Sequence, residues 1–291
     1  MKLSYLILSL IILPVLFHGH LYAQDFIQGT IVNEKTRSAV PYATIGLLKS
    51  NTGTNADESG KFRLKIFTNA DDTVIISSVG YQTLKIKLSV AISNDTFSLM
   101  PKYIQLKSIT VSNKNEWTSE TVGKFDDCGD YGLVSSGFQT QVAKLFQSNR
   151  ENALLSSVTI CCKTFLFSSE KSIFRLRIYN QDSVTGRPSE ELCSEVIEVS
   201  QKNKKTEVDL EPYRIWLPHK NFFIAVEWLI IPSNKEAKSK GRKANQLPCY
   251  YPRIGAKNVE PVTKDTWMLT YRNVWSPMTG HSVSISASIK Y

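Results

Sequence analysis

The sequence predicts an all-β protein built from two β-sandwich domains. Beyond residue 24 the chain consists of short apolar or alternating runs separated by turn residues, which is the pattern expected of strands. No part of it sustains a helical period. The chain has 291 residues, and because a domain usually has roughly 100–200 residues, this length accommodates two.

Residues 1–23 resemble a secretory signal peptide. Lys2 precedes an apolar run over residues 6–17, and a polar stretch then ends at Ala23. The apolar run is too short for a membrane helix, which needs about 20 residues, and a small final residue suits signal peptidase. We therefore expect an exported protein that begins at Gln24, with no transmembrane segment in the mature chain. Its destination would be the periplasm, the outer-membrane surface or the medium.

The formal charge of the chain is +9 at neutral pH, which favours anionic partners. No nucleic-acid recognition motif accompanies this charge, and an exported protein meets envelope surfaces first. We expect an envelope protein or a surface glycan as the partner, and no nucleic acid.

Two segments of the first part, residues 61–66 and 84–88, alternate apolar with cationic residues. Such alternation is typical of half-buried strands with one wet face. The residues expected to face a core are Phe62, Leu64, Ile66, Leu84, Ile86 and Leu88. Residues 74–76 form a continuous apolar run instead, which predicts a strand covered on both sides. Two packed sheets would satisfy both patterns.

Five landmarks in this region carry a resemblance to a known family. They are GTIV at 29–32, AVPYATI at 39–45, TGT at 52–54, DESGKF at 57–62 and VGY at 79–81. In their order and spacing, residues 24–112 resemble the carboxypeptidase-like regulatory domain. The resemblance implies a seven-stranded, transthyretin-like sandwich that serves as an accessory, non-catalytic module. In Bacteroidota the module also precedes TonB-dependent receptors, but this chain is too short to add a plug and a large barrel.

Residues 113–135 are rich in polar and turn-forming residues, which predicts a connector. A second domain follows over residues 136–291. Its expected strands span residues 154–167, 172–179, 195–200, 206–210, 222–231, 266–271 and 282–291. Their spacing predicts a second sandwich. Parts of three of these strands resemble jelly-roll domains of exported Bacteroidota proteins, so we expect this sandwich to be jelly-roll-like.

All five cysteines lie beyond residue 112, so no disulfide can stabilise the first domain. An oxidising compartment permits bridges in the second, but five cysteines allow at most two, and the pairing stays open. Adjacent Cys161 and Cys162 would point to opposite faces of a strand. One of them is expected in the core.

The sequence predicts no active site. Beyond the leader the histidines are His219 and His281, and neither has the HExxH spacing of zinc peptidases. GHSVS at 280–284 approaches the GxSxG nucleophile elbow, but Ser284 replaces the final glycine, and a strand pattern follows where a helix is required. Neither phosphate-binding glycine motif occurs. We therefore expect a non-enzymatic protein that has no catalytic residues and no cofactor.

Two acidic patterns approach calcium sites. NADESG at 55–60 matches the start of an EF-hand loop, but Ile66 stands where the bidentate Glu is required, which favours a β-turn. Asp126, Asp127 and Asp130 form a denser cluster with the ligand chemistry for loose calcium binding. The alternative for that cluster is a solvated connector, and no metal site is predicted.

Ligand-binding residues are expected among the aromatic side chains near the C-terminus. They are Trp267, Trp275, Tyr250, Tyr251 and Tyr271, beside a basic loop at 235–243. Amphipathic rings with nearby cations suit an acidic glycan or a lipid headgroup. The alternative is that the rings fill a core, as we expect of Trp228.

Two functions follow. In the first, the regulatory-like domain is a spacer or docking module, and the second sandwich binds a partner or glycan. In the second, the protein is a structural component of an outer-membrane-associated assembly. An unrecognised enzyme is a third and weaker alternative.

Overall fold

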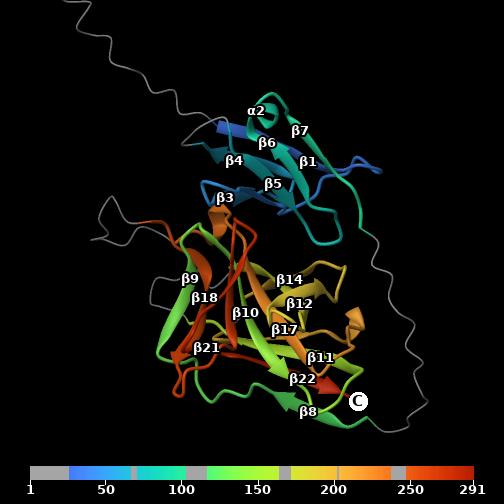
Figure 1. Cartoon of the computed structure of the whole chain (residues 1–291), viewed down its shortest axis with the longest axis vertical. Helices are drawn as coiled ribbons and strands as arrows, with labels where there is room; N and C mark the ends of the chain where they lie inside the picture. Colours follow the sequence, from blue (N-terminus) through green and yellow to red (C-terminus); the bar gives the residue numbers. More distant parts are fainter. Residues whose placement is uncertain (1–25, 67–70, 103–116, 164–171, 202, 237–246) are drawn as a thin grey trace, which may run out of the picture.

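The computed structural model describes residues 26–66, 71–102, 117–163, 172–201, 203–236 and 247–291. The predicted signal peptide lies outside these residues. The described chain forms two bodies, each built mainly of strands (Figure 1). The predicted all-β fold class is confirmed. Among the described residues, no helix has the length and apolar character that a membrane span requires.

The first domain, over the described residues 26–102, contains seven strands in two sheets. The three-stranded sheet has the order β4-β1-β7 and the four-stranded sheet the order β3-β2-β5-β6. The elements are β1 (Phe26–Asn33), β2 (Thr44–Leu47), β3 (Thr52–Asn55), β4 (Lys61–Lys65), β5 (Thr73–Ser77), β6 (Leu84–Lys87), α2 (Leu88–Ala91) and β7 (Thr96–Leu99). This is the seven-stranded sandwich that the resemblance implies.

The core of the first domain contains the side chains that the alternation predicts. Phe62, Leu64, Ile66 and Leu88 are buried, and Leu84 and Ile86 pack against them. Leu88 begins the short helix α2 and does not extend the strand. The continuous apolar run in β5 is covered on both sides, because Val74 and Ile76 belong to the core while Ile75 faces the second domain.

The second domain contains three antiparallel sheets over the described residues. Their elements are β8 (Ser119–Val122), β9 (Tyr131–Ser135), β10 (Gln139–Gln147), β11 (Ala153–Cys161), β12 (Ile173–Gln181), β13 (Pro188–Glu191), β14 (Ile197–Ser200), β15 (Lys205–Asp209), η1 (Glu211–Tyr213), β16 (Trp216–Leu217), β17 (Asn221–Trp228), η2 (Pro232–Asn234), β18 (Tyr250–Asn258), β19 (Thr266–Thr270), β20 (Trp275–Pro277), β21 (His281–Val283) and β22 (Ile285–Lys290).

The seven-stranded sheet follows the order β13-β12-β17-β10-β19-β20, with β14 also on β12. The five-stranded sheet is β15-β11-β22-β8, with β16 on β11, and the third sheet is β21-β18-β9. One apolar core joins side chains of all three, including Phe174, Ile254 and Ile289. Successive long strands such as β10, β11 and β12 alternate between the sheets, as they do in jelly rolls.

The predicted alternation holds over β22, where Ile285, Ala287 and Ile289 are buried and Ser286, Ser288 and Lys290 are not. Val283 lies on the separate strand β21, where Ser282 is also buried, so the predicted single strand over residues 282–291 is two strands. The predicted connector differs from the structure over residues 119–135. There β8 pairs with β22, and β9 pairs with β18. The polar composition of this segment conceals two short strands, because their pairing partners lie more than 100 residues away along the chain.

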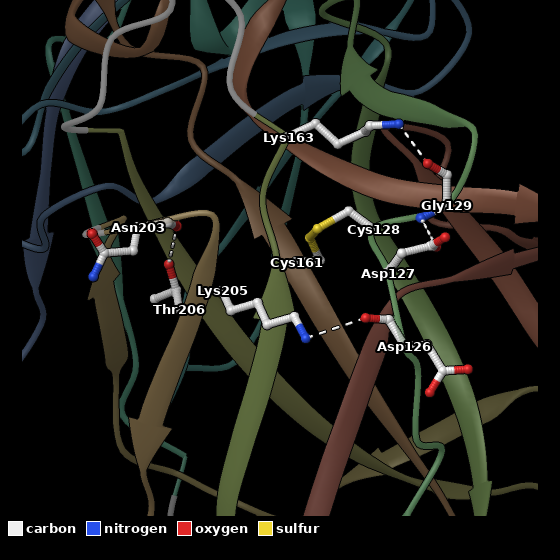
Figure 2. Close-up of a disulfide and its surroundings, with 9 residues drawn as sticks. All are labelled: Asp126, Asp127, Cys128, Gly129, Cys161, Lys163, Asn203, Lys205 and Thr206. Carbon is white, nitrogen blue, oxygen red and sulfur yellow. Dashed lines mark hydrogen bonds between the residues drawn. A yellow bond between two sulfur atoms is a disulfide. The ribbon is translucent and has the colours of Figure 1, made fainter.

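A disulfide joins Cys128, between β8 and β9, to Cys161 at the end of β11 (Figure 2). Beside it the Asp127 carboxylate accepts a hydrogen bond from the Gly129 N–H, and Lys163 Nζ donates to the Gly129 carbonyl. The neighbouring Cys162 is a buried core residue, and burial raises the pKa of its thiol to about 12.

Candidate ligand-binding cleft

A cleft of about 390 Å³ lies between the two domains. One wall is the outer face of the four-stranded sheet, where Thr44, Gly46 and Ile75 alternate with residues that point into the core. The other wall comes from the seven-stranded sheet, including Arg177 and Glu227. The volume lies within the range of small-ligand pockets, about 300–1,000 Å³.

Arg177 on β12 is the electrostatic centre of the second wall. Its Nε and Nη2 donate to the carboxylate of Glu191 on β13, and its Nη1 donates to Glu227 Oε2 on β17 at 3.1 Å. Burial disfavours the charged guanidinium, but Tyr179, Glu227 and Glu191 outweigh this effect and hold the pKa of Arg177 well above its ordinary value. The other oxygen of Glu227 accepts a 3.4 Å hydrogen bond from Thr44 Oγ1 of the first domain.

Four aromatic side chains line the cleft, namely Tyr81, Tyr179, Tyr271 and Trp275. Tyr179 donates its hydroxyl to Gln141 Oε1 at 2.9 Å, and its ring meets the half-buried ring of Trp275 edge-on with centroids 5.8 Å apart. Tyr271 is 4% exposed, and its hydroxyl has no hydrogen-bond partner among the described residues. Burial raises the pKa of both tyrosines. Both hydroxyls therefore stay protonated at neutral pH. Tyr179 already uses its proton in the bond to Gln141, whereas the proton of Tyr271 has no acceptor among the described residues.

The rest of the lining is mostly polar. Hydroxyl and amide groups come from Ser77, Thr83, Thr140, Ser189, Thr270 and Asn273. The charged groups are three carboxylates, on Glu190, Glu191 and Glu227, and two cations, on Arg177 and Lys102. Since Arg177 is occupied by two of the carboxylates, the cleft does not concentrate positive charge. It can offer hydrogen bonds and aromatic faces to a neutral ligand.

The predicted ligand-binding residues take different positions. Tyr271 and Trp275 line the cleft. Trp267 is buried on β19, where its Nε1 donates to the Lys264 carbonyl at 3.0 Å. Tyr250 and Tyr251 lie on β18 and are not part of the lining, and Tyr251 is buried. A ligand-binding role for this set stays a prediction.

Other predicted features have structural roles. Trp228 is a core residue whose Nε1 donates to the Pro252 carbonyl at 2.8 Å. Asp57 accepts hydrogen bonds from the Ser59 and Lys61 N–H groups, so the EF-hand-like segment is the turn that we expected. Most of the basic loop, its residues 237–243, lies outside the described residues.

Sequence reasoning missed most of the cleft. Arg177 and Tyr179 alternate with buried Leu176 and Ile178, which marks a polar outer face of a strand. That pattern alone predicts a strand face that is exposed to water. It does not indicate that another domain covers this face. No group of histidine, cysteine or acidic side chains suited to hold a metal ion occurs among the residues that the structure describes.

The first domain, with its two-sheet sandwich and its place in one wall of the cleft, matches a known family. Residues 27–111 match the family model of the CarboxypepD_reg-like domain. This match confirms the resemblance seen in the five sequence landmarks. The CarboxypepD_reg-like domain fits a non-catalytic role for the part of the chain that it covers.

The comparison with curated proteins found no match. Among solved structures, the cysteine protease and lectin-like domains of Cwp84, a surface layer associated protein of Clostridium difficile, align at 10% identity and a TM-score of 0.35. That alignment covers 86% of this chain and 59% of the other. A "putative carbohydrate binding protein" from Bacteroides uniformis aligns at 9% identity and a TM-score of 0.22, over 79% of this chain and 96% of the other. Both TM-scores lie below 0.5, and neither likeness supports an inference about this chain.

Proposed function

We propose that the protein is a non-catalytic binding protein that takes a neutral glycan in the cleft between its two domains. The supporting observation is the lining, where the half-buried aromatic rings of Tyr81 and Trp275 stand among hydroxyl, amide and carboxylate groups. A sugar presents an apolar C–H face that packs on an aromatic ring and hydroxyl edges that hydrogen-bond to polar side chains. A polyanionic ligand is disfavoured, because carboxylates outnumber cations in the lining.

The pairing of two lining carboxylates with Arg177 favours a binding role over a hydrolytic one. Glu191 and Glu227 both accept hydrogen bonds from Arg177. Both carboxylates are therefore engaged by a guanidinium, whereas a glycosidase needs a carboxyl group that is free to act on the leaving group.

The proposal is tested on a glycan array that carries neutral and acidic glycans, followed by titration of the best ligand. We expect saturable binding of a neutral glycan. Trp275→Ala should weaken it by about 2 kcal/mol, or roughly 30-fold in Kd, since buried aromatic anchors contribute most to such sites. Trp117→Ala is the matched control, because Trp117 is 45% exposed and outside the cleft lining.

Two results would count against the proposal. One is the absence of saturable binding to any neutral glycan on the array. The other is equal binding by Trp275→Ala and the unchanged protein. Either result would favour the alternative of a structural component in an outer-membrane-associated assembly.

We also propose that the chain is exported and cleaved after Ala23. The disulfide between Cys128 and Cys161 supports this proposal, because disulfides persist mainly in oxidising compartments. Mass spectrometry of the exported protein should find Gln24 at the N-terminus. Retention of Met1 on that form would contradict the proposal.

A further inference from the structure

We infer that the first domain is a docked, obligatory wall of the cleft, held on the second domain by a surface made of Tyr42, Gly46, Gly53 and Asn55. We call these four residues the docking surface. The docking itself is independent of the proposed function. Its consequence for ligand binding rests on the proposed function. In this arrangement the first domain is not a spacer, and the two domains bind a ligand as one body.

Two glycines form a seat for the Tyr271 ring. Gly46 on β2 and Gly53 on β3 are register partners, so both lie at one position of the sheet. A Cβ at Gly46 would lie 2.7 Å from Tyr271 Cδ1, and a Cβ at Gly53 would overlap the same ring. Glycine weakens a strand interior and often marks a site where another group approaches closely. Here the approaching group is an aromatic ring of the other domain.

A buried cation makes the second contact. Arg175 on β12 is 2% exposed. Its Nη2 donates to the Pro41 carbonyl at 2.8 Å and its Nη1 to the Tyr42 carbonyl at 3.3 Å, while the guanidinium lies 5.4 Å from the centroid of the Tyr42 ring. A charged group is rarely buried without partners. The partners of Arg175 include two carbonyls that only the first domain supplies.

Asn55 makes the third contact, and its amide bridges the domains. Its Nδ2 donates to the Tyr42 carbonyl and to Thr44 Oγ1, each at 3.1 Å, and its Oδ1 accepts from the Ile230 N–H at 2.8 Å. Asn55 is 6% exposed. Tyr42 also packs in an apolar cluster with Leu229 and Ile231 of the second domain. These three contacts, made by Tyr271, Arg175 and Asn55, together constrain the orientation of one domain on the other.

Hydrogen exchange of the full-length protein tests the docking. The Ile230 N–H is bonded across the interface, so its protection reports docking directly. Gly46→Val should raise its exchange rate by on the order of tenfold or more, because the three atoms nearest to a Cβ at position 46 all belong to Tyr271 of the second domain. Thr96→Val is the matched control, since it adds the same side chain on β7 of the other sheet.

Several outcomes would overturn the docking. One is an Ile230 N–H that exchanges in the unchanged protein as fast as an exposed loop amide. A second is unaltered Ile230 protection in Gly46→Val. If Gly46→Val also loosens β1 and β5, Arg175→Met on the opposite side of the interface decides the matter. Faster exchange at Ile230 in Arg175→Met supports docking, and no change overturns it.

Glycan binding tests the consequence separately. Arg175→Met removes an interdomain contact and changes no residue of the cleft lining, so it should lose binding of the array-selected glycan only if the first domain is a necessary wall. Full binding by an undocked Arg175→Met protein would overturn that role. If the unchanged protein binds no glycan, the proposed function fails, while the Ile230 exchange still supports or overturns docking.

Discussion

Removing the disulfide between Cys128 and Cys161 should lower the stability of the second domain by about 3.7 kcal/mol. The bridge spans 33 residues. Cross-linking a loop of that length removes about 12.5 cal/mol/K of chain entropy from the unfolded state, which is about 3.7 kcal/mol at 25 °C. Both cysteines are buried, so lost packing adds to this figure. For a domain of this size the melting temperature should fall by roughly 7–15 °C.

The assay is urea unfolding of the Cys128→Ala/Cys161→Ala double variant, with intrinsic tryptophan fluorescence as the probe, since all five tryptophans lie in the second part of the chain. Cys162→Ala is the control, because it keeps the bridge and removes a buried thiol beside it. Reduction with dithiothreitol should destabilise the unchanged protein and leave the double variant unaltered. A double variant that loses less than about 1 kcal/mol would refute the loop-closure reasoning.

Two further substitutions test the core and the interior charge. Leu64→Asp should unfold the first domain, because it buries a carboxylate without a partner. Lys65→Asp is the control and should be tolerated, since residue 65 lies on the opposite side of the strand. Resistance of the Leu64→Asp protein to limited proteolysis would contradict the predicted unfolding. Burial lowers the pKa of Lys144 to about 8, below the value near 10.5 of an unfolded lysine. Between about pH 8 and 10 the unfolded chain therefore binds more protons than the folded one, so stability should rise with pH. Lys144→Met should lack that rise, and the two proteins should differ in urea titrations across this window; identical pH profiles would rule the explanation out.

Local patterns predicted the first domain well. The alternation of residues 61–66 depends only on which side chains one strand turns inward, so Phe62, Leu64 and Ile66 were assigned to the core and are buried there. The turn at Asp57 depends on hydrogen bonds within four residues. Such features are set by neighbours along the chain, and the sequence displays those neighbours directly.

Predictions that depended on distant partners were less complete. The segment predicted as a connector, residues 113–135, contains β8 and β9. The prediction missed these strands because the strands that pair with them come from the last third of the chain. Aromatic density near the C-terminus indicated both Trp275, which lines the cleft, and Trp267, which is buried. A ring in a strand has the same sequence signature in either position. Only the packing of the sheet separates them.

The sequence by itself determined the all-β class, the sandwich of the first domain and the residues that fill its core, because alternation and turn residues act locally. Only the tertiary structure decided where the cleft lies. Its walls are outer sheet faces, which alternation marks as open to water. The Arg175 and Tyr42 that help close one face on the other are 133 residues apart. Arg177, Tyr271 and Trp275 lie opposite the first domain because the two sandwiches pack against each other, and no local sequence pattern encodes that packing.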